Sequence, residues 1–447
     1  PDIWSRSLAN GIEVLGIEDR ELPLVTFNLV LPGGQWLDKK PGTASLLAAL
    51  STQGTANRTA AELEEAIGRL GAQVSVTAAG EAFTFSVTTL ERNLEAIVAL
   101  LEELLLEPRW DEAEFERLRS ATEASLIAEE GDAGSVAGVV TRRLLYGDVH
   151  PFGKSPDGTR ESVKAMTIDD LKAWHAANFT PAGARLQVVG AVDPERVERA
   201  FGSLSKHWTG EPLAIPDYEL PPAPTGRAVY FVDIPGAKQS VIRVGKRVVP
   251  VTDPDWLRLN YATQRLGGGS SARLMQLLRI EKGYTYGAGA FVGGNVNAPS
   301  PWLAYTSVRA NVTLESMELI REQIERYAAT FTDEDADVTK NQVIKQNARA
   351  YETLAAKLAL LDRIALRDLP HDIVEQEIAT LQSMSTADFQ SVISESLEES
   401  EMIWVIVGDG ASQFERLEGF GYGEPVELDR RGTAAALEKG AERTGQN

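Results

Sequence analysis

The sequence contains no cysteine and only four histidines among its 447 residues. Without cysteine there can be no disulfide bond, no thiolate nucleophile and no cysteine-ligated zinc or iron–sulfur site. The histidines lie far apart, at His150, His175, His207 and His371. Two imidazoles share one face of a helix only when they are three or four residues apart, so a metal site built from histidines of one helix is excluded.

Basic residues and long hydrophobic runs are also scarce. The chain has 44 Lys+Arg against 65 Asp+Glu, which gives a net charge of −21. This charge argues against nucleic acid as a partner, because phosphate groups are bound by basic surfaces. No uncharged apolar run reaches the roughly 18 residues that a membrane span requires, so we expect no transmembrane helix.

The chain is long enough for two domains, and 43% of its residues are hydrophobic, which suffices for two packed cores. Residues 209–226 contain five prolines and read as a stiff, extended linker. We therefore expect an N-terminal domain over residues 1–208 and a C-terminal domain over residues 227–428. Residues 429–447 have little apolar pattern and are expected to form a tail.

The two halves show the same order of alternating and helical patterns, which predicts a duplicated α+β domain. In the first half, strands are expected at 12–17, 24–31, 73–77, 82–88 and 185–192. Helices are expected from about Thr43, at 59–70, 94–106 and 111–130, and from Thr167 and Pro194. In the second half, strands are expected at 229–232, 240–244, 288–292, 302–308 and 402–407. The helices there are expected at 255–266, 272–281, 314–330, 337–361 and 386–397.

A segment of small residues carries the first informative motif. Residues 41–58 read PGTASLLAALSTQGTANR, and a helical pattern ending in Leu-Gly-Ala follows at 70–72. The segment resembles the metal-binding helix of the pitrilysin, insulysin and mitochondrial processing peptidase family, which are inverzincin metallopeptidases. In that family a Gly-x-Ala-His-x-x-Glu-His helix precedes a Gly-Thr and a helix ending in Leu-Gly-Ala. The flanking positions match here, at Gly42, Ala44, Gly54, Thr55, Leu70, Gly71 and Ala72.

The zinc-site positions of this motif do not match. The resemblance places the family's two histidines and its glutamate on Ser45, Ala48 and Ala49, and its distal zinc-ligand glutamate on Ser125. Nearby carboxylates cannot replace two imidazoles, so the resemblance implies that this chain binds no metal. Without the flanking motif, a small-residue packing face would be the better interpretation of this helix.

The second motif is LGGGSSARLMQLLRIEKGYTYG, at residues 266–287. It resembles the family's second-domain signature, in which Arg-x-x-x-Gly-x-x-Tyr follows a glycine-rich turn. The resemblance implies that Arg279 and Tyr286 approach a peptide held at the zinc site of an opposing domain. A guanidinium can hold a peptide carbonyl, and a phenol can donate to the oxyanion that forms at a scissile carbonyl. The alternative is a solvated helix arginine and a strand tyrosine that packs in the core.

Two further patterns are assigned structural roles. The glycines at 267–269 are not followed by Lys-Ser/Thr, so a phosphate-binding loop is not indicated. Residues 146–159 resemble the family's Gly-Asp-His-Pro-Tyr-Gly loop with Val149 inserted, which makes His150 a loop-structuring residue.

Active members of this family enclose a peptide in a chamber of four homologous domains, and this chain supplies two. The resemblance therefore implies half of a clamshell chamber, in which each domain is a mainly antiparallel sheet with helices on one face. It also implies a non-zinc-binding subunit of a heteromeric zinc peptidase, whose partner carries His-x-x-Glu-His and the zinc. A scaffold of the same fold without proteolytic function and an enzyme of unrelated chemistry are the alternatives. The missing N-terminal Met and the lack of cysteine favour the bacterial periplasm over the cytoplasm.

Overall fold

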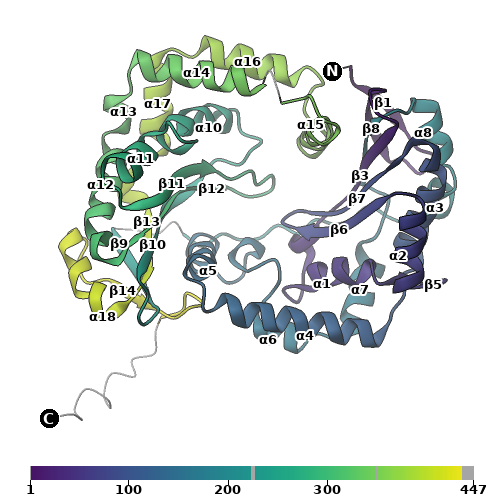
Figure 1. The fold of residues 1–447 in the computed structure, drawn as a ribbon, viewed down its shortest axis with the longest axis horizontal. Coiled ribbons are helices and arrows are strands. Elements are labelled where there is room, and N and C mark those ends of the chain that lie inside the picture. Colours follow the sequence, from purple (N-terminus) through teal and green to yellow (C-terminus); the bar gives the residue numbers. More distant parts are fainter. Residues whose placement is uncertain (1, 223–226, 348–349, 435–447) are drawn as a thin grey trace.

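Each half of the chain forms one six-stranded sheet in the computed structural model, which describes residues 2–222, 227–347 and 350–434 (Figure 1). The N-terminal sheet has the strand order β1-β2-β8-β3-β7-β6 and the C-terminal sheet the order β11-β12-β10-β13-β9-β14. The pairs β2–β8, β9–β13 and β9–β14 are parallel and the other pairs are antiparallel. These two mixed, mainly antiparallel sheets with their helices confirm the predicted two-domain α+β fold.

The strands extend most of the predicted ranges by a few residues. The N-terminal sheet comprises β1 (Trp4–Ser7), β2 (Glu13–Glu18), β3 (Leu24–Pro32), β6 (Gln73–Ala79), β7 (Ala82–Leu90) and β8 (Arg185–Gly190). The C-terminal sheet comprises β9 (Ala228–Asp233), β10 (Gln239–Val248), β11 (Thr285–Val292), β12 (Ser300–Arg309), β13 (Ile403–Gly408) and β14 (Val426–Leu428). A separate two-stranded pair is formed by β4 (Gly54–Thr55) and β5 (Arg58–Thr59).

The helices of the first half begin where the capping residues predict. Thr59 and Thr167 form capping boxes with Glu62 and Asp170, and Asp193 caps a helix that begins with a proline. The helices are α1 (Thr43–Ser51), α2 (Ala60–Arg69), α3 (Leu94–Leu106), α4 (Glu112–Glu129), α5 (Ala133–Tyr146), α6 (Arg160–Lys164), α7 (Ile168–Asn178), α8 (Pro194–Ala200) and α9 (Leu204–His207). Short 3₁₀ turns lie at η1 (Gly34–Leu37), η2 (Glu91–Asn93) and η3 (Pro151–Gly153).

The second half contains a π-helical turn besides its α-helices and 3₁₀ turns. The α-helices are α10 (Pro254–Gly267), α11 (Arg273–Met275), α12 (Thr313–Glu325), α13 (Tyr327–Thr330), α14 (Asp333–Asn347), α15 (Leu354–Arg367), α16 (Ile373–Ser383), α17 (Thr386–Ser396) and α18 (Gly410–Gln413). The π-helical turn is η4 (Gln276–Glu281), and the 3₁₀ turns are η5 (Ala310–Val312), η6 (Glu399–Glu401) and η7 (Glu415–Phe420).

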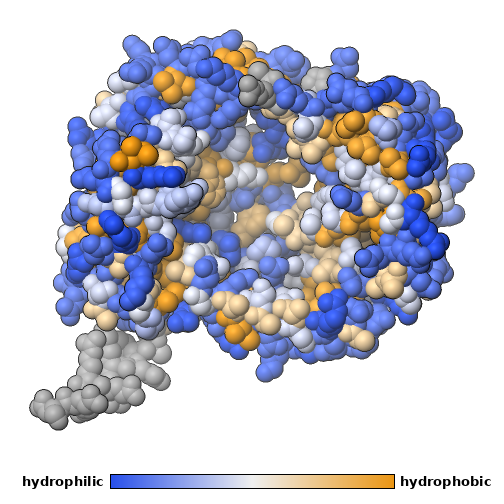
Figure 2. Space-filling view, viewed as in Figure 1, coloured by the Kyte–Doolittle hydropathy of each residue, from blue (hydrophilic) through white to orange (hydrophobic). Residues whose placement is uncertain are grey.

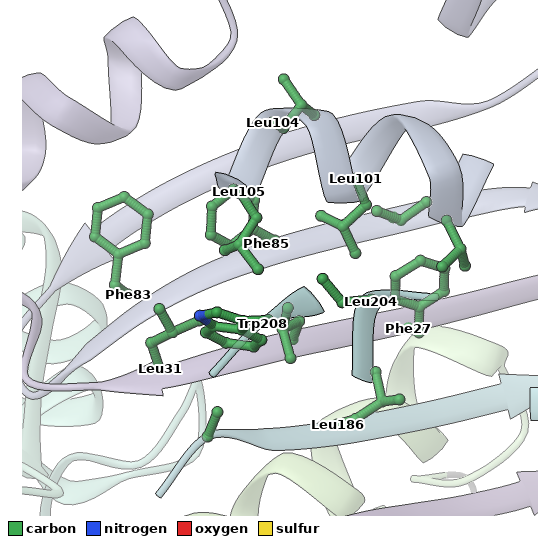
Figure 3. Packing of buried hydrophobic residues seen from close by; sticks show 14 of the residues in the cluster. Phe27, Leu31, Phe83, Phe85, Leu101, Leu104, Leu105, Leu186, Leu204 and Trp208 are labelled. Carbon is green, nitrogen blue, oxygen red and sulfur yellow. The ribbon is translucent and has the colours of Figure 1, made fainter. Parts of the chain in front are cut away.

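Alternation of side chains along the strands places one face of each sheet in a hydrophobic core. In the first half, Phe27, Phe83 and Phe85 are buried on that face beneath leucines of α3 (Figure 3). Leu204 and Trp208, from the C-terminal end of the first half, are buried in the same cluster. The second half has an equivalent core around Phe231, Trp302 and Trp404, among others.

Each half also contributes one helix that packs on the sheet of the other half. Helix α5 packs on β10 and β13, where Val136 and Val140 contact Val405 and its neighbours. Helix α15 packs on β2, β3 and β8, where Leu358 and Leu361 bury Ile17 and Val189. Figure 1 shows both helices between the two sheets, on opposite sides of the molecule.

Sequence reasoning was wrong about both of these helices. The predicted single helix over 337–361 is two helices, because α14 ends at Asn347 and Thr353 caps the start of α15. No helix was predicted over 133–146, since glycines at 131, 134 and 138 lower the helix propensity of this stretch. The structure shows that burial against the other half stabilises this helix in spite of its glycines.

The two halves also meet through their hairpins and through the linker. The Glu81 carboxylate, between β6 and β7, accepts hydrogen bonds from the backbone N–H groups of Val296 and Asn297, between β11 and β12. The linker carbonyl of Pro216 accepts from the Trp36 indole, and that of Pro221 accepts from Arg247. Between the halves the molecular surface is hollowed (Figure 2). Among the described residues, no helix is long and apolar enough to cross a membrane.

Candidate functional site

Arg279 and Tyr286 lie together at the edge of the C-terminal sheet. The Arg279 guanidinium carbon is 4.5 Å from the centre of the Tyr286 ring, a cation–π contact. Arg279 lies in the π-helical turn η4, and Gly283 follows with a φ of +63°, which lets the chain reverse into β11. π-Helical turns occur frequently at functional sites. The structure therefore brings the two predicted residues into direct contact.

A β-bulge presents Tyr286 to solvent. Thr285 pairs with Val308 and Ala288 pairs with Thr306, so that Tyr286 and Gly287 oppose the single residue Ser307. The Thr285 hydroxyl lies 2.7 Å from the Ser307 carbonyl, and it accepts from the Gly287 N–H at 3.0 Å. The Tyr286 side chain is 86% exposed. It is not the core-packing tyrosine of the alternative interpretation.

An open cleft of about 590 Å³ lies beside this bulge. Tyr286, Tyr305, Arg243 and Arg309 are among the residues that line it. Sequence reasoning missed Arg243 and Tyr305, which belong to β10 and β12. Only the strand register, which pairs Arg243 with Tyr305 and Tyr305 with Gly289, brings them next to β11.

The glycine run before Arg279 has a packing role. A Cβ atom on Gly267 would lie 2.0 Å from the backbone nitrogen of Ala290, so only glycine lets the end of α10 approach β11 this closely. The run thus supports the strand that carries Tyr286.

The positions that correspond to the family's zinc ligands lie on two helices in mutual contact, α1 and α4. The Ser45 hydroxyl donates to Asp157 at 2.6 Å, and the exposed Ser125 donates to Glu129 at 3.3 Å. Ala48 is buried and Ala49 is half-buried. In the part of the chain that the structure describes, no three His, Cys, Asp or Glu residues are grouped as a metal site would require. This donor set does not fit a zinc ion.

His150 is buried within an aromatic cluster and organises the loop after α5. Its Nδ1 accepts a hydrogen bond from the Phe152 N–H, and its ring packs against Trp36 and Tyr146. Burial lowers the pKa of His150 to about 4, so the ring is neutral at pH 7.

Two sequence models of known families match the chain. Residues 14–134 match the model described as insulinase (peptidase family M16), and residues 165–343 match the model described as the peptidase M16 inactive domain. The two matches cover the α1 region and the first part of the second half, including Arg279 and Tyr286.

Curated relatives extend the similarity to most of the chain. A protein named non-peptidase homolog YmxG from Helicobacter pylori is 21% identical over 410 residues, which are 89% of this chain and 92% of that protein. An uncharacterized zinc protease of Streptomyces coelicolor is 23% identical over 378 residues, which are 82% of this chain and 80% of that protein.

Solved structures share the fold. A peptidase M16 inactive domain from Pseudomonas fluorescens superposes with a TM-score of 0.85 at 23% identity and covers 92% of this chain and 98% of that chain. A protease from Helicobacter pylori superposes with a TM-score of 0.84 at 19% identity and covers 91% and 99%. At these identities the likeness concerns the fold.

Proposed function

Because this chain belongs to the M16 peptidase family, we propose that it is the non-zinc-binding subunit of a heteromeric zinc peptidase. The partner would be a homologous chain that carries an intact His-x-x-Glu-His helix and its zinc ion. The chain described here would close the peptide chamber. It would also contribute Arg279 and Tyr286 to a site whose metal lies in the partner.

The observation that carries this proposal is the combination of an exposed Arg279–Tyr286 pair with helices that lack zinc ligands. The pair is held by a bulge and a π-helical turn, both of which are common at functional sites. The positions on α1 and α4 offer serine and alanine in place of ligands. A chain of this kind can bind and polarise a peptide but cannot activate water with its own metal.

In the complex, the Tyr286 hydroxyl would donate a hydrogen bond to the oxygen of the scissile carbonyl as negative charge develops on it. Arg279 would hold a neighbouring carbonyl of the peptide and, through its contact with the ring, orient Tyr286. The peptide would bind in extended form by pairing with an edge strand of the chamber. The zinc ion, when bound by the partner, supplies the Lewis acid and the activated water.

A scaffold role within the same fold is the second candidate. The name of the Helicobacter pylori relative, non-peptidase homolog, favours it. In that case Arg279 and Tyr286 would be remnants of an ancestral peptidase site.

A reconstitution experiment separates the two candidates. The chain is purified alone, the co-purifying homologue with His-x-x-Glu-His is purified separately, and zinc content and cleavage of a quenched fluorescent peptide are measured before and after mixing. We expect no stoichiometric zinc and no cleavage by this chain alone, weak cleavage by the partner, and strong cleavage by a complex with one zinc per pair. Chelator-sensitive cleavage by this chain alone contradicts the proposal, and a stable complex without peptidase activity supports the scaffold.

A further inference from the structure

Two arginines from different halves of the chain meet beside the cleft. Arg142 lies on α5 and Arg243 lies on β10, beneath that helix. A Cβ atom on Gly138 would lie 3.4 Å from Nη1 of Arg243 and 3.6 Å from Nη1 of Arg142. Both guanidinium groups therefore border the same glycine, which leaves room for them between the helix and the sheet.

The positive charge of this arginine pair is not neutralised by a direct contact. Within the described ranges neither arginine forms an ion pair, and the Nε of Arg142 is buried without a hydrogen-bond acceptor. Arg243 donates only to the Gly134 carbonyl, at 3.1 Å. Burial lowers the pKa of both guanidinium groups, and the charge of Arg243 lowers that of Arg142 further. Two half-buried like charges that no carboxylate contacts directly favour the binding of an anion between them.

The nearest carboxylates are engaged elsewhere. Asp157 and Glu129 act on Arg142 through space, but Asp157 accepts the Ser45 hydroxyl and Glu129 accepts the Ser125 hydroxyl. Each of these carboxylates thus accepts a serine hydroxyl, and among the described residues neither forms an ion pair with Arg142.

One member of the arginine pair, Arg243, lines the same cleft as Tyr286, and the Arg142 guanidinium lies next to it at Gly138. Arg243 lines this cleft and stands opposite Tyr305, which is 47% exposed. Gly289 lets the Tyr305 ring lie across β11, because a Cβ atom there would be 2.9 Å from the Tyr305 hydroxyl. Tyr305 therefore lies between β11 and Arg243, so a peptide that crosses the strands from Tyr286 would pass over the Tyr305 ring before it reaches the arginines.

We propose that Arg142 and Arg243 bind a carboxylate of the peptide in this cleft, supplied either by its C-terminus or by an Asp or Glu side chain. Guanidinium groups offer paired N–H donors that match the two oxygens of a carboxylate. The whole chain carries a net charge of −21, which disfavours acidic groups near most of its surface. The positive arginine pair would therefore be the place in the cleft where an acidic group of the peptide binds. This inference rests on the proposed function, because it takes the ligand to be a peptide.

Calorimetric titration of the full chain tests the inference with three peptides of one length, composed of Ala, Val, Thr and one Tyr. The first has a free C-terminal carboxylate, the second is amidated, and the third is amidated with one internal Glu. We expect the first or the third to bind about tenfold or more tightly than the second, as the loss of hydrogen bonds to a charged group predicts. The preferred peptide identifies the source of the carboxylate.

Arg142→Gln and Arg243→Gln should each remove this preference, while Arg326→Gln, at an exposed position on the end of α12, should retain it. Among the described residues the Arg142 side chain makes no hydrogen bond, so Arg142→Gln removes none and serves as the check if Arg243→Gln fails to fold. Equal affinity of the wild-type chain for all three peptides overturns this inference alone. If none of the peptides binds, the proposed peptide-binding role fails together with it.

Discussion

At the scale of single residues, the exposure of Tyr286 depends on the hydroxyl of its neighbour Thr285. That hydroxyl bridges the Ser307 carbonyl and the Gly287 N–H within the bulge. The motif at 266–287 predicted that Arg279 and Tyr286 act together, but not how the backbone would display them. Bulge geometry depends on the register with β12, which a local pattern does not encode.

Replacing Thr285 with Val should therefore disturb the bulge without changing the size of the side chain. We expect a loss of about 1 kcal/mol in the free energy of unfolding, the usual contribution of such hydrogen bonds. Urea unfolding followed by tryptophan fluorescence measures it. Thr285→Ser keeps the hydroxyl and should stay close to the wild type; equal losses in both variants would show that the hydroxyl has no role.

A second residue-scale prediction concerns Asp362 of α15, which lies against the N-terminal sheet. Burial raises its pKa to about 6, although Asn28 donates a hydrogen bond to it at 2.6 Å. When the Gln187 amide nitrogen points towards Asn28 and Asp362, it donates to the Asn28 carbonyl and, at 3.0 Å, to Oδ1 of Asp362. Between pH values of about 4 and about 6, the Asp362 carboxyl is therefore protonated in the folded protein and ionised in the unfolded chain, where its pKa is 3.8.

This difference in pKa makes the free energy of unfolding decrease as the pH rises from about 4 to about 6, after which the contribution is constant. Relative to Asp362→Asn, the wild type should lose about 1 to 2 kcal/mol between pH 5 and pH 7. Urea unfolding of both proteins at the two pH values gives the comparison. A difference between them that does not change with pH would show that Asp362 is ionised in the folded protein at both values.

At the scale of elements, the sequence predicted the helix starts and the strands, which depend on residues close to one another in the chain. Caps such as Thr59 and Thr167 marked helix starts correctly, and alternation located the central strands. The helices that cross between the halves were missed or merged, because α5 contains glycines and the segment before α15 contains neither Gly nor Pro. Their stability comes from burial against a sheet that is distant in sequence.

Gly267 and Gly68 allow a prediction about helix packing, since both lie in helices but in opposite surroundings. At Gly267 an added Cβ would meet the β11 backbone at 2.0 Å, whereas at Gly68 nothing lies within 4 Å. Gly267→Ala should destabilise the protein by about 2 kcal/mol or more through overpacking. Gly68→Ala should stabilise it by roughly 0.5–1 kcal/mol, because alanine favours the helix. Thermal unfolding of both variants decides this, and the same sign of change in both would contradict it.

At the scale of the whole molecule, α5 and α15 each pack on the sheet of the other half. They join the two halves, and the surface between the halves is hollowed (Figures 1 and 2). The helices with the positions that correspond to the family's zinc ligands, α1 and α4, belong to the first half, and the Arg279–Tyr286 pair belongs to the second. The two-domain fold could be predicted from the sequence by resemblance. The arginine pair could not, because residues 142 and 243 come together only when one half packs on the other.

The proposed function requires that Arg279 and Tyr286 of this chain act at a zinc site in its partner. The most direct measurement is the kcat of the reconstituted complex containing Tyr286→Phe or Arg279→Ala, with Arg326→Ala as the control for loss of an exposed arginine. We expect both site variants to lower kcat by about a hundredfold or more, as removal of an oxyanion donor does elsewhere, while complex formation and zinc content stay unchanged. A kcat equal to that of the wild-type complex in both variants would contradict the claim and leave the chain a scaffold.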